Sequence, residues 1–305
     1  MQKMFAKKLI QAPLAGYSCA AFRVLAEQWG KPDFCYSEML SAQHIASGAR
    51  LRKRYVYKAP QEGRLCVQLA GDHAETLINA AQQAITWGAN LIDLNCGCPQ
   101  PKIRRKNLGS RLLDNSEHLY ELVSRLRATI DVPLLVKIRI SQHNHTIAQA
   151  IQAAGADAIT VHGRHWTQDY TTPVNYAAIA EIKAAVTIPV IGNGDVCDTA
   201  SAKRMFDETG CDAVMIARAS VGQPWLFEKI YQELQGNHYE APTLTAIGNI
   251  FLAHVRGLIE LEGEKIALLQ SRKLGKYYAS AFQNIHHIHS YAQLEAFIHD
   301  QYTSS

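Results

Sequence analysis

The chain has 305 residues, which is enough for one large domain or for a domain with a smaller appendage. Its net charge of +4 permits a polyanionic partner without requiring one, and no apolar run approaches the ~18 residues of a membrane-spanning helix. The seven scattered cysteines are typical of free thiols in a reducing compartment. We therefore expect a cytoplasmic protein without a membrane segment, and a monomer is the default expectation.

Short apolar runs typical of β-strands alternate with segments of helical periodicity. The expected strands are Leu9–Ala12, Phe34–Ser37, Leu65–Leu69, Leu91–Asn95, Leu134–Arg139, Ala158–His162, Pro189–Gly192 and Ala213–Ile216. The clearest helical segments between them are His73–Trp87, Ser116–Ile130, Thr146–Ala154, Asn175–Ala185 and Thr199–Thr209. Glycines at positions 88, 155 and 210 follow three of these segments and suit helix C-caps.

Strand–helix units repeated about eight times over roughly 230 residues predict an α/β protein with a (β/α)₈ TIM barrel. A doubly wound open sheet is the alternative, but the first turn, Ala12 to Gly16, lacks the glycine-rich pattern of that fold. After Pro242 the strand signal ends, and helical periodicity continues through three segments. We therefore predict a barrel domain over residues 1–240 and a small all-helical domain over residues 241–305.

The stretch LIDLNCGCP, from Leu91 to Pro99, combines a buried strand with a polar turn. Alternation places Asp93 and Asn95 on one face of the strand, which indicates a polar site rather than packing. Cys96 and Cys98 are both candidates for a reactive thiol, although most such cysteines are buried and small apolar residues. The stretch by itself leaves open which thiol reacts.

Polar and cationic residues end nearly every predicted strand, where the active sites of barrels lie. Lys137 and Arg139 share the inward face of one strand, and buried cations need anionic partners. The segment Asn193-Gly194-Asp195 and the later Arg218 occur on the last two strands, which commonly bind phosphate, although a plain tight turn would also explain them. Together with His162, these residues describe a site for FMN.

Motifs along essentially the whole chain resemble the tRNA-dihydrouridine synthases. They are APLAGYS…FR (12–23), SEM (37–39), VQLAG (67–71), LNCGCP (94–99), KIR (137–139), HGR (162–164), PVIGNGD (189–195), DAVMIARA (212–219) and EKIALLQSRKLGKYY (264–278). The resemblance implies an FMN enzyme that reduces uridine in tRNA with NADPH or NADH. It also implies that Cys98 is the proton donor and that the helical tail binds RNA.

The resemblance implies a role for each further site residue. The residues expected at the cofactor are Pro13, Leu14, Ala15, Gln68, Asn95, Lys137, His162, Asn193, Gly194, Asp195, Ala217 and Arg218. Two of the positions that depart from the family pattern are Ala217, which replaces a glycine beside the phosphate, and Arg111, which replaces a small residue. Neither removes a required chemical group.

Basic segments beside the predicted barrel mouth suggest contacts with an RNA backbone, although each run taken singly also fits a solvated surface. The expected substrate-binding residues are Asn95, Lys102, Arg104, Arg105, Arg139, Arg272 and Lys273, and a further basic run spans residues 50–54. We expect no metal site, since the histidines at 286, 287 and 289 suit a helix end at the surface.

Three other functions compete with this prediction. An FMN barrel acting on a free pyrimidine would share the cofactor motifs but would not need the basic rim or the helical tail. A non-catalytic RNA-binding barrel would not need Cys98, and a Schiff-base aldolase using Lys137 would leave the N-x-G-C-P motif without a role.

Overall fold

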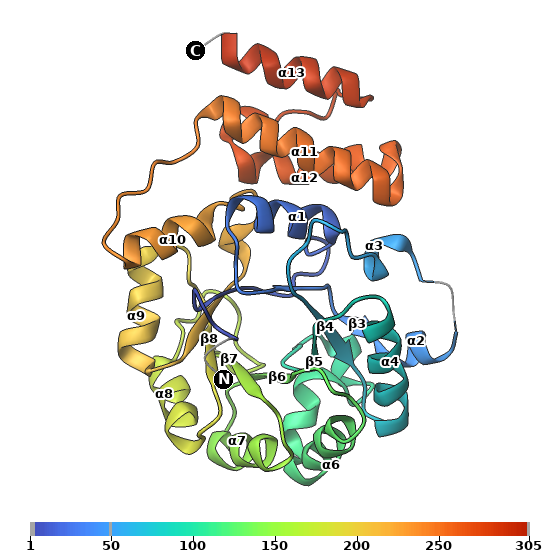
Figure 1. Ribbon diagram of the computed structural model, residues 1–305, viewed down its shortest axis with the longest axis vertical. Coiled ribbons are helices and arrows are strands. Elements are labelled where there is room, and N and C mark those ends of the chain that lie inside the picture. Colours follow the sequence, from blue (N-terminus) through green and yellow to red (C-terminus); the bar gives the residue numbers. More distant parts are fainter. Residues whose placement is uncertain (1–3, 49–50, 304–305) are drawn as a thin grey trace.

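The computed structural model describes residues 4–48 and 51–303, and it contains a closed parallel barrel surrounded by helices (Figure 1). The barrel strands are β1 (Leu9–Gln11), β2 (Cys35–Tyr36), β4 (Leu65–Ala70), β5 (Leu91–Cys96), β6 (Leu134–Arg139), β7 (Ala158–His162), β8 (Val190–Asn193) and β9 (Ala213–Ile216). Parallel pairing of β1 with both β2 and β9, and of β2 with β4, closes the ring. The predicted (β/α)₈ fold is confirmed. The sequence reading missed the two-residue strand β3 (Leu40–Ser41), which pairs with the end of β4.

Helices follow the strands and surround the barrel, because each predicted helical segment has one apolar face that can be buried against the strands. Around the barrel they are α1 (Ala20–Trp29), α2 (Ala42–Ala46), α3 (Lys53–Val56), α4 (Ala74–Thr86), α5 (Pro101–Arg104), α6 (Ser116–Arg127), α7 (Asn144–Ala153), α8 (Tyr176–Ala185), α9 (Thr199–Thr209) and α10 (Leu226–Leu234). Side chains of Asn115, Asn175 and Asp198 accept backbone N–H groups at the starts of α6, α8 and α9. Gly210, with φ +64°, ends α9 in the left-handed conformation that favours glycine.

Side-chain alternation along the strands separates two buried regions. On β5, Leu91 belongs to the apolar cluster inside the barrel, whereas Ile92, Leu94 and Cys96 pack against the surrounding helices. The inner cluster also contains Ile10, Phe34, Tyr36, Cys66, Leu135, Ile191 and Met215. On β4 to β8, residues two or four positions further along the inward faces are polar, so these strands lead from an apolar interior to a polar mouth.

Three helices form the C-terminal part of the chain and lie beyond α1 on one side of the barrel (Figure 1). They are α11 (Leu244–Glu262), α12 (Glu264–Tyr278) and α13 (Tyr291–Thr303). Their apolar cluster includes Leu25 of α1 and Trp225 before α10, so it extends to the barrel surface. A Cβ atom on Gly257 would lie 2.9 Å from the Cβ of Ala21, and glycine therefore lets α11 approach α1 closely.

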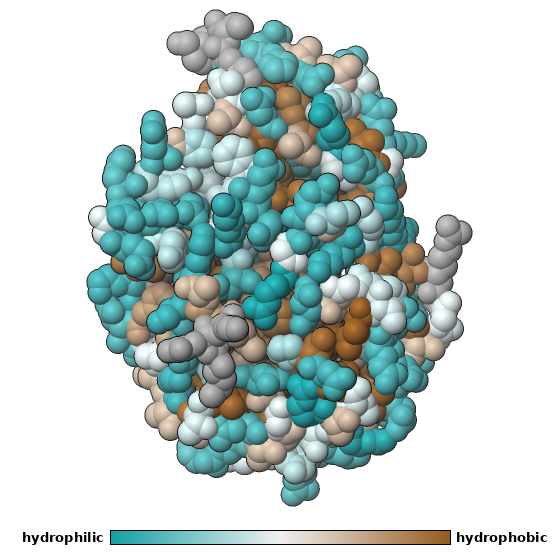
Figure 2. All heavy atoms as spheres, in the orientation of Figure 1, coloured by the Kyte–Doolittle hydropathy of each residue, from teal (hydrophilic) through white to brown (hydrophobic). Residues whose placement is uncertain are grey.

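Helix α11 is, among the described residues, the one helix long and apolar enough to cross a membrane by length and composition. Its residues Phe251, Val255 and Leu258 are buried in the C-terminal cluster, as in the core helix of a helical domain. Hydrophilic residues cover most of the face shown in Figure 2, and the hydrophobic residues there form separate patches.

Candidate active site

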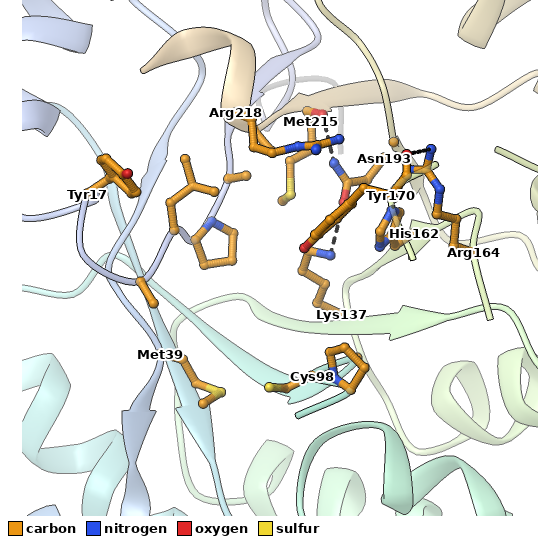
Figure 3. Close-up of a pocket in the computed structure, with 18 of the residues that line it drawn as sticks. Tyr17, Met39, Cys98, Lys137, His162, Arg164, Tyr170, Asn193, Met215 and Arg218 are labelled. Carbon is orange, nitrogen blue, oxygen red and sulfur yellow. Dashed lines mark hydrogen bonds between the residues drawn. The ribbon is translucent and has the colours of Figure 1, made fainter. Parts of the chain in front are cut away.

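A cavity of about 1230 Å³ opens at the C-terminal ends of the barrel strands (Figure 3). The predicted site residues that line it are Pro13, Leu14, Ala15, Gln68, Asn95, Cys98, Lys102, Lys137, Arg139, His162, Asn193, Gly194, Asp195, Ala217 and Arg218. They come from β-strand ends and loops between residues 13 and 218, so the parallel barrel brings together residues that are far apart in the sequence.

A chain of hydrogen bonds forms the floor of the cavity on β4 and β5. The Gln68 side chain donates from Nε2 to Asp93 Oδ2 at 2.8 Å, and its Oε1 accepts from Asn95 Nδ2 at 2.8 Å. Asp93 is fully buried, and this burial raises the pKa of its carboxyl group. The shared face of Asp93 and Asn95 that the alternation predicted is therefore present, with Gln68 as the link.

Cys98 lies in the turn after β5, with its sulfur toward the cavity (Figure 3). The turn is held by Asn95 Oδ1, which accepts the backbone N–H of Cys98 at 3.0 Å, and by Ser110, whose hydroxyl donates to the Cys98 carbonyl at 3.1 Å. A Cβ atom on Gly109, where φ is +62°, would lie 2.7 Å from that carbonyl oxygen. By contrast, Cys96 points into the core between strands and helices, and burial raises the pKa of its thiol. The geometry thus presents only one of these two thiols to the cavity.

Two cations extend from β6 toward the cavity. Lys137 Nζ donates to Asn193 Oδ1 at 3.1 Å, and burial lowers the pKa of the lysine. Arg139 donates to the carbonyl oxygens of Gly97 at 3.0 Å and His165 at 2.9 Å, so it connects the Cys98 turn to the loop after β7. Arg139 was predicted to bind substrate; it lines the cavity, and two of its guanidinium nitrogens, Nε and Nη1, donate hydrogen bonds within the protein.

His162 ends β7 in a strongly positive environment. Burial is the main cause of its lowered pKa, and the charges of Lys137, Arg139, Arg164 and Arg218 lower it further. The imidazole is consequently neutral at ordinary pH and can accept as well as donate hydrogen bonds.

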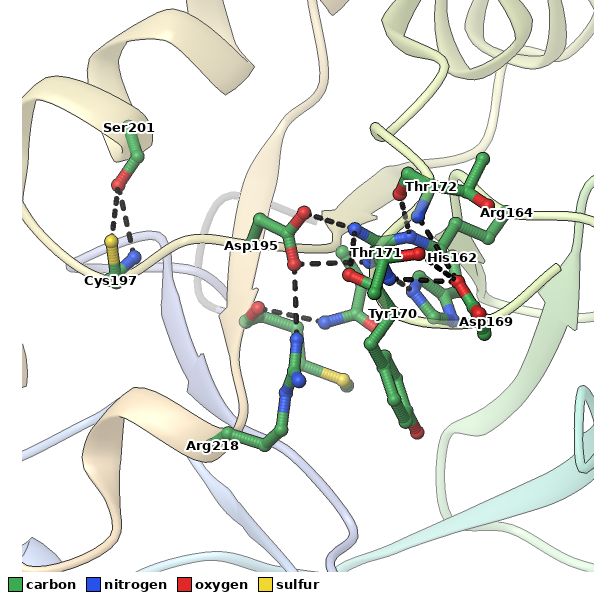
Figure 4. Close-up of polar contacts among 12 residues, drawn as sticks. His162, Arg164, Asp169, Tyr170, Thr171, Thr172, Asp195, Cys197, Ser201 and Arg218 are labelled. Carbon is green, nitrogen blue, oxygen red and sulfur yellow. Dashed lines mark hydrogen bonds and ion pairs between the residues drawn. The ribbon is translucent and has the colours of Figure 1, made fainter. Parts of the chain in front are cut away.

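The loops after β7, β8 and β9 line the other end of the cavity, and Figure 4 shows the polar contacts among their residues. Arg164 and Arg218 both bind the carboxylate of Asp195, at 3.0 Å and 3.1 Å respectively. The ring of Tyr170 lies 4.1 Å from the Arg218 guanidinium carbon and is 58% exposed. Sequence reasoning did not assign Tyr170 to the site, because a tyrosine in a loop of irregular pattern carries no signal of its own.

The two departures from the family pattern are accommodated. Ala217 has φ −110°, so its backbone does not need the conformational freedom of glycine. Arg111 is exposed and pairs with Asp114 at 2.7 Å, away from the cavity lining.

The predicted RNA contacts divide into two groups. Lys102, Arg105 and Lys273 are exposed, and of these only Lys102 lines the cavity. Arg104 stacks 3.7 Å from the Trp166 ring and donates to Ser110, whereas Arg272 donates to the Ile288 carbonyl at 3.2 Å. Both arginines therefore have hydrogen-bond or ring-stacking partners within the protein.

The basic run at residues 50–54 is exposed only in part among its described residues. Arg54 is 5% exposed and pairs with Glu38 and Glu262, so its assignment to an RNA-binding surface is wrong. Arg52 and Lys53 are exposed, and Arg50 lies outside the described residues. Several other cavity residues were not among the predicted site residues, and they include Tyr17, Met39, Lys276 and Tyr277. Within residues 4–48 and 51–303, no group of three or more His, Cys, Asp or Glu side chains could hold a metal ion.

Solved structures share the barrel at low sequence identity. An old yellow enzyme homologue from Zymomonas mobilis aligns with a TM-score of 0.53 and 12% identity, over 79% of this chain and 92% of that one. A morphinone reductase mutant in complex with tetrahydroNAD aligns with a TM-score of 0.52 and 12% identity, over 78% of this chain and 89% of that one. These similarities establish the fold.

Sequence comparisons are more specific. The tRNA-dihydrouridine synthase B of Pseudomonas aeruginosa is 35% identical over 90% of this chain and 84% of that protein. The protein of the same name from Escherichia coli K12 is 34% identical over 91% of this chain and 88% of that protein. A probable tRNA-dihydrouridine synthase 1 from Synechocystis is 34% identical over 90% of this chain and 79% of that protein. The family model described as "Dihydrouridine synthase (Dus)" matches residues 10–301, and the chain belongs to this family.

Proposed function

We propose that this protein is a tRNA-dihydrouridine synthase, which reduces the C5=C6 bond of uridine in tRNA with FMN as cofactor and NADPH or NADH as electron donor. The observation that carries the proposal is the convergence of the Cys98 thiol and the Lys137 ammonium on one cavity. The names of the similar proteins support tRNA as the substrate.

The residues present fit a phosphate-bearing planar cofactor. Arg164 and Arg218 share the single carboxylate of Asp195, which leaves positive charge for a phosphate beside Asn193, Gly194 and Ala217. The wall formed by Pro13, Leu14 and Ala15 suits a flat ring, and Gln68, Asn95, Lys137 and His162 offer polar groups to its edges. We assign these residues to FMN.

FMN held by these residues would supply hydride chemistry at C6 of the uracil, with the electrons coming from NADPH or NADH. Cys98 donates a proton to C5. One hydride at C6 and one proton at C5 together account for the two hydrogens and two electrons that saturate the C5=C6 bond. Asn95, Lys137 and His162 are the candidates for stabilising negative charge on the uracil O4. Cys98 is part-exposed, so its thiolate can take up a proton from solvent after the reaction.

The substrate must leave the RNA stack to reach this cavity, so we infer that the enzyme binds an extruded uridine. We assign residues 1–240 to catalysis and residues 241–305 to RNA binding, with Lys102, Arg105 and Lys273 as backbone contacts. The proposal includes a cytoplasmic, monomeric enzyme.

The test uses purified protein and unmodified tRNA transcripts. We expect a flavin absorbance spectrum, oxidation of NADPH or NADH, and dihydrouridine in the transcript by mass spectrometry. Reduction of free uracil without dihydrouridine in RNA would instead support the small-molecule oxidoreductase. A protein without flavin would overturn both.

A further inference from the structure

The cavity has an aromatic edge that the proposed chemistry does not use. Tyr17, in the loop after β1, and Tyr277, on α12, meet edge to face with ring centroids 6.3 Å apart and an angle of 89°. Both rings line the cavity, together with Lys276, and Tyr277 is 40% exposed. The edge is thus built from the barrel and the C-terminal helices together.

The Tyr277 side of this edge is held by close backbone packing. A Cβ atom on Gly222 would lie 2.3 Å from the carbonyl carbon and oxygen of Tyr277, so only glycine lets the two backbones approach to this distance. Gly222 follows the turn that carries Arg218, which connects α12 directly to the proposed phosphate end of the cavity.

The Tyr17 side is held by a buried charge network. The backbone N–H of Gly16 donates to Glu38 Oε2 at 2.7 Å, and Glu38 Oε1 accepts from Arg54 at 2.8 Å. Arg54 also donates to Glu262 at 2.5 Å and to Gln270 at 2.9 Å, which ties the loop of Tyr17 to the end of α11 and to α12. The two tyrosines are therefore fixed relative to each other.

The size of the cavity leaves room for part of the substrate strand beside the cofactor. Sites for one small ligand usually measure about 300–1000 Å³, whereas this cavity measures about 1230 Å³. Exposed aromatic rings beside a cation are the combination with which proteins bind single-stranded nucleic acid, because rings stack on bases and cations contact phosphates.

We propose that Tyr17 and Tyr277 form a stacking platform for a base next to the target uridine, and that Lys276 contacts the phosphate of that nucleotide. The proposal rests on the proposed function and extends it to the flanking nucleotide. The platform holds the RNA strand at the point where the target uridine leaves the neighbouring base and enters the cavity.

The experiment compares Tyr277→Ala, Tyr277→Phe and Tyr17→Leu with the wild-type holoenzyme. Tyr120→Ala is the matched control, since Tyr120 is 44% exposed on α6 and does not line the cavity. For each protein we would measure flavin content, the rate of flavin reduction by NADPH, tRNA-transcript affinity by fluorescence anisotropy, and kcat/KM for dihydrouridine formation.

We expect Tyr277→Ala and Tyr17→Leu to lower kcat/KM for tRNA by about 5- to 150-fold, the effect of losing one base–aromatic stack. Flavin content and flavin reduction should stay at wild-type values, and the Phe and Tyr120→Ala variants should stay within about twofold because both keep the platform rings. An unchanged kcat/KM in both ring-removing variants would overturn the proposal. The proposal would also be overturned if flavin reduction by NADPH were the one measurement that slows in these variants, because the rings would then serve the nicotinamide.

The wild-type measurement separates this proposal from the function on which it rests. If wild-type protein forms no dihydrouridine in any tRNA transcript, the proposed function fails. If it forms dihydrouridine and the ring-removing variants match it, only the stacking platform is wrong. If one variant fails to fold, the other decides the result, since the two rings belong to different parts of the chain.

Discussion

Asn95 holds the backbone of Cys98: its Oδ1 accepts the cysteine N–H at 3.0 Å while its Nδ2 donates to Gln68 at 2.8 Å. The same amide therefore lines the cavity and orients the turn that carries the thiol. Because Gln68 is bonded in turn to buried Asp93, the position of Cys98 depends on a network that reaches into the barrel interior.

Removal of the thiol should separate proton transfer from binding. We expect Cys98→Ala to lower the rate of dihydrouridine formation by about 10²- to 10⁴-fold, the usual contribution of a positioned acid, with flavin content and tRNA affinity unchanged. Cys96→Ala is the control, because Cys96 faces the helices. Full activity in the Cys98 variant, or its loss in the Cys96 variant alone, would contradict the assignment.

Lys137 should give the enzyme an alkaline limit. Burial lowers the pKa of the lysine, so its positive charge is lost as the pH rises through a value below the ordinary 10.5. We expect kcat/KM to fall through that range in wild-type protein. Lys137→Met should be slower at neutral pH, lack this fall, and lower the flavin potential. A redox titration with an unchanged potential would place Lys137 away from the flavin.

The same lowered pKa has a defined effect on stability. Between the folded and unfolded pKa values the unfolded state binds more protons, so this lysine contributes stability as the pH rises through that window. The gain in wild-type unfolding free energy over this window should be absent in Lys137→Met, as measured by urea denaturation at each pH.

Arg54 should be needed for stability rather than for contact with RNA. Arg54→Met leaves the carboxylates of Glu38 and Glu262 buried without their partner, and loss of one member of a buried pair costs about 3–5 kcal/mol. Thermal unfolding would measure this loss. Arg204→Met, which breaks an exposed pair with Glu208, should leave the melting temperature nearly unchanged. Equal melting temperatures for the two variants would contradict the role of the network.

Adjacent basic residues on α12 should differ in their effects on RNA binding. Lys273 is exposed, and Lys273→Ala should reduce the slope of log affinity against log salt by ~0.7–0.9 if it contacts one phosphate. Arg272 donates to the Ile288 carbonyl, so Arg272→Ala should lower the melting temperature and leave the salt slope unchanged. The reverse result would exchange the two roles.

Local patterns in the sequence determined the barrel and much of its site. Period-two alternation placed Lys137 and Arg139 on the same inward face, and helix-ending glycines such as Gly210 marked the boundaries between units. These features depend on residues close together in the chain, because strand alternation and helix caps are local geometry. The family motifs added the expected role of Cys98.

Only the tertiary structure decided which charged side chains are exposed and which distant residues contact each other. Arg54 lies in a basic run that fits a solvated surface, yet carboxylates from Glu38 and Glu262 bury it. Tyr17 and Tyr277 are 260 residues apart by their numbers, and their contact depends on how α12 packs against the barrel. Partners so distant leave no periodic trace in the sequence, since their pairing is set by the packing of whole elements rather than by local backbone preference.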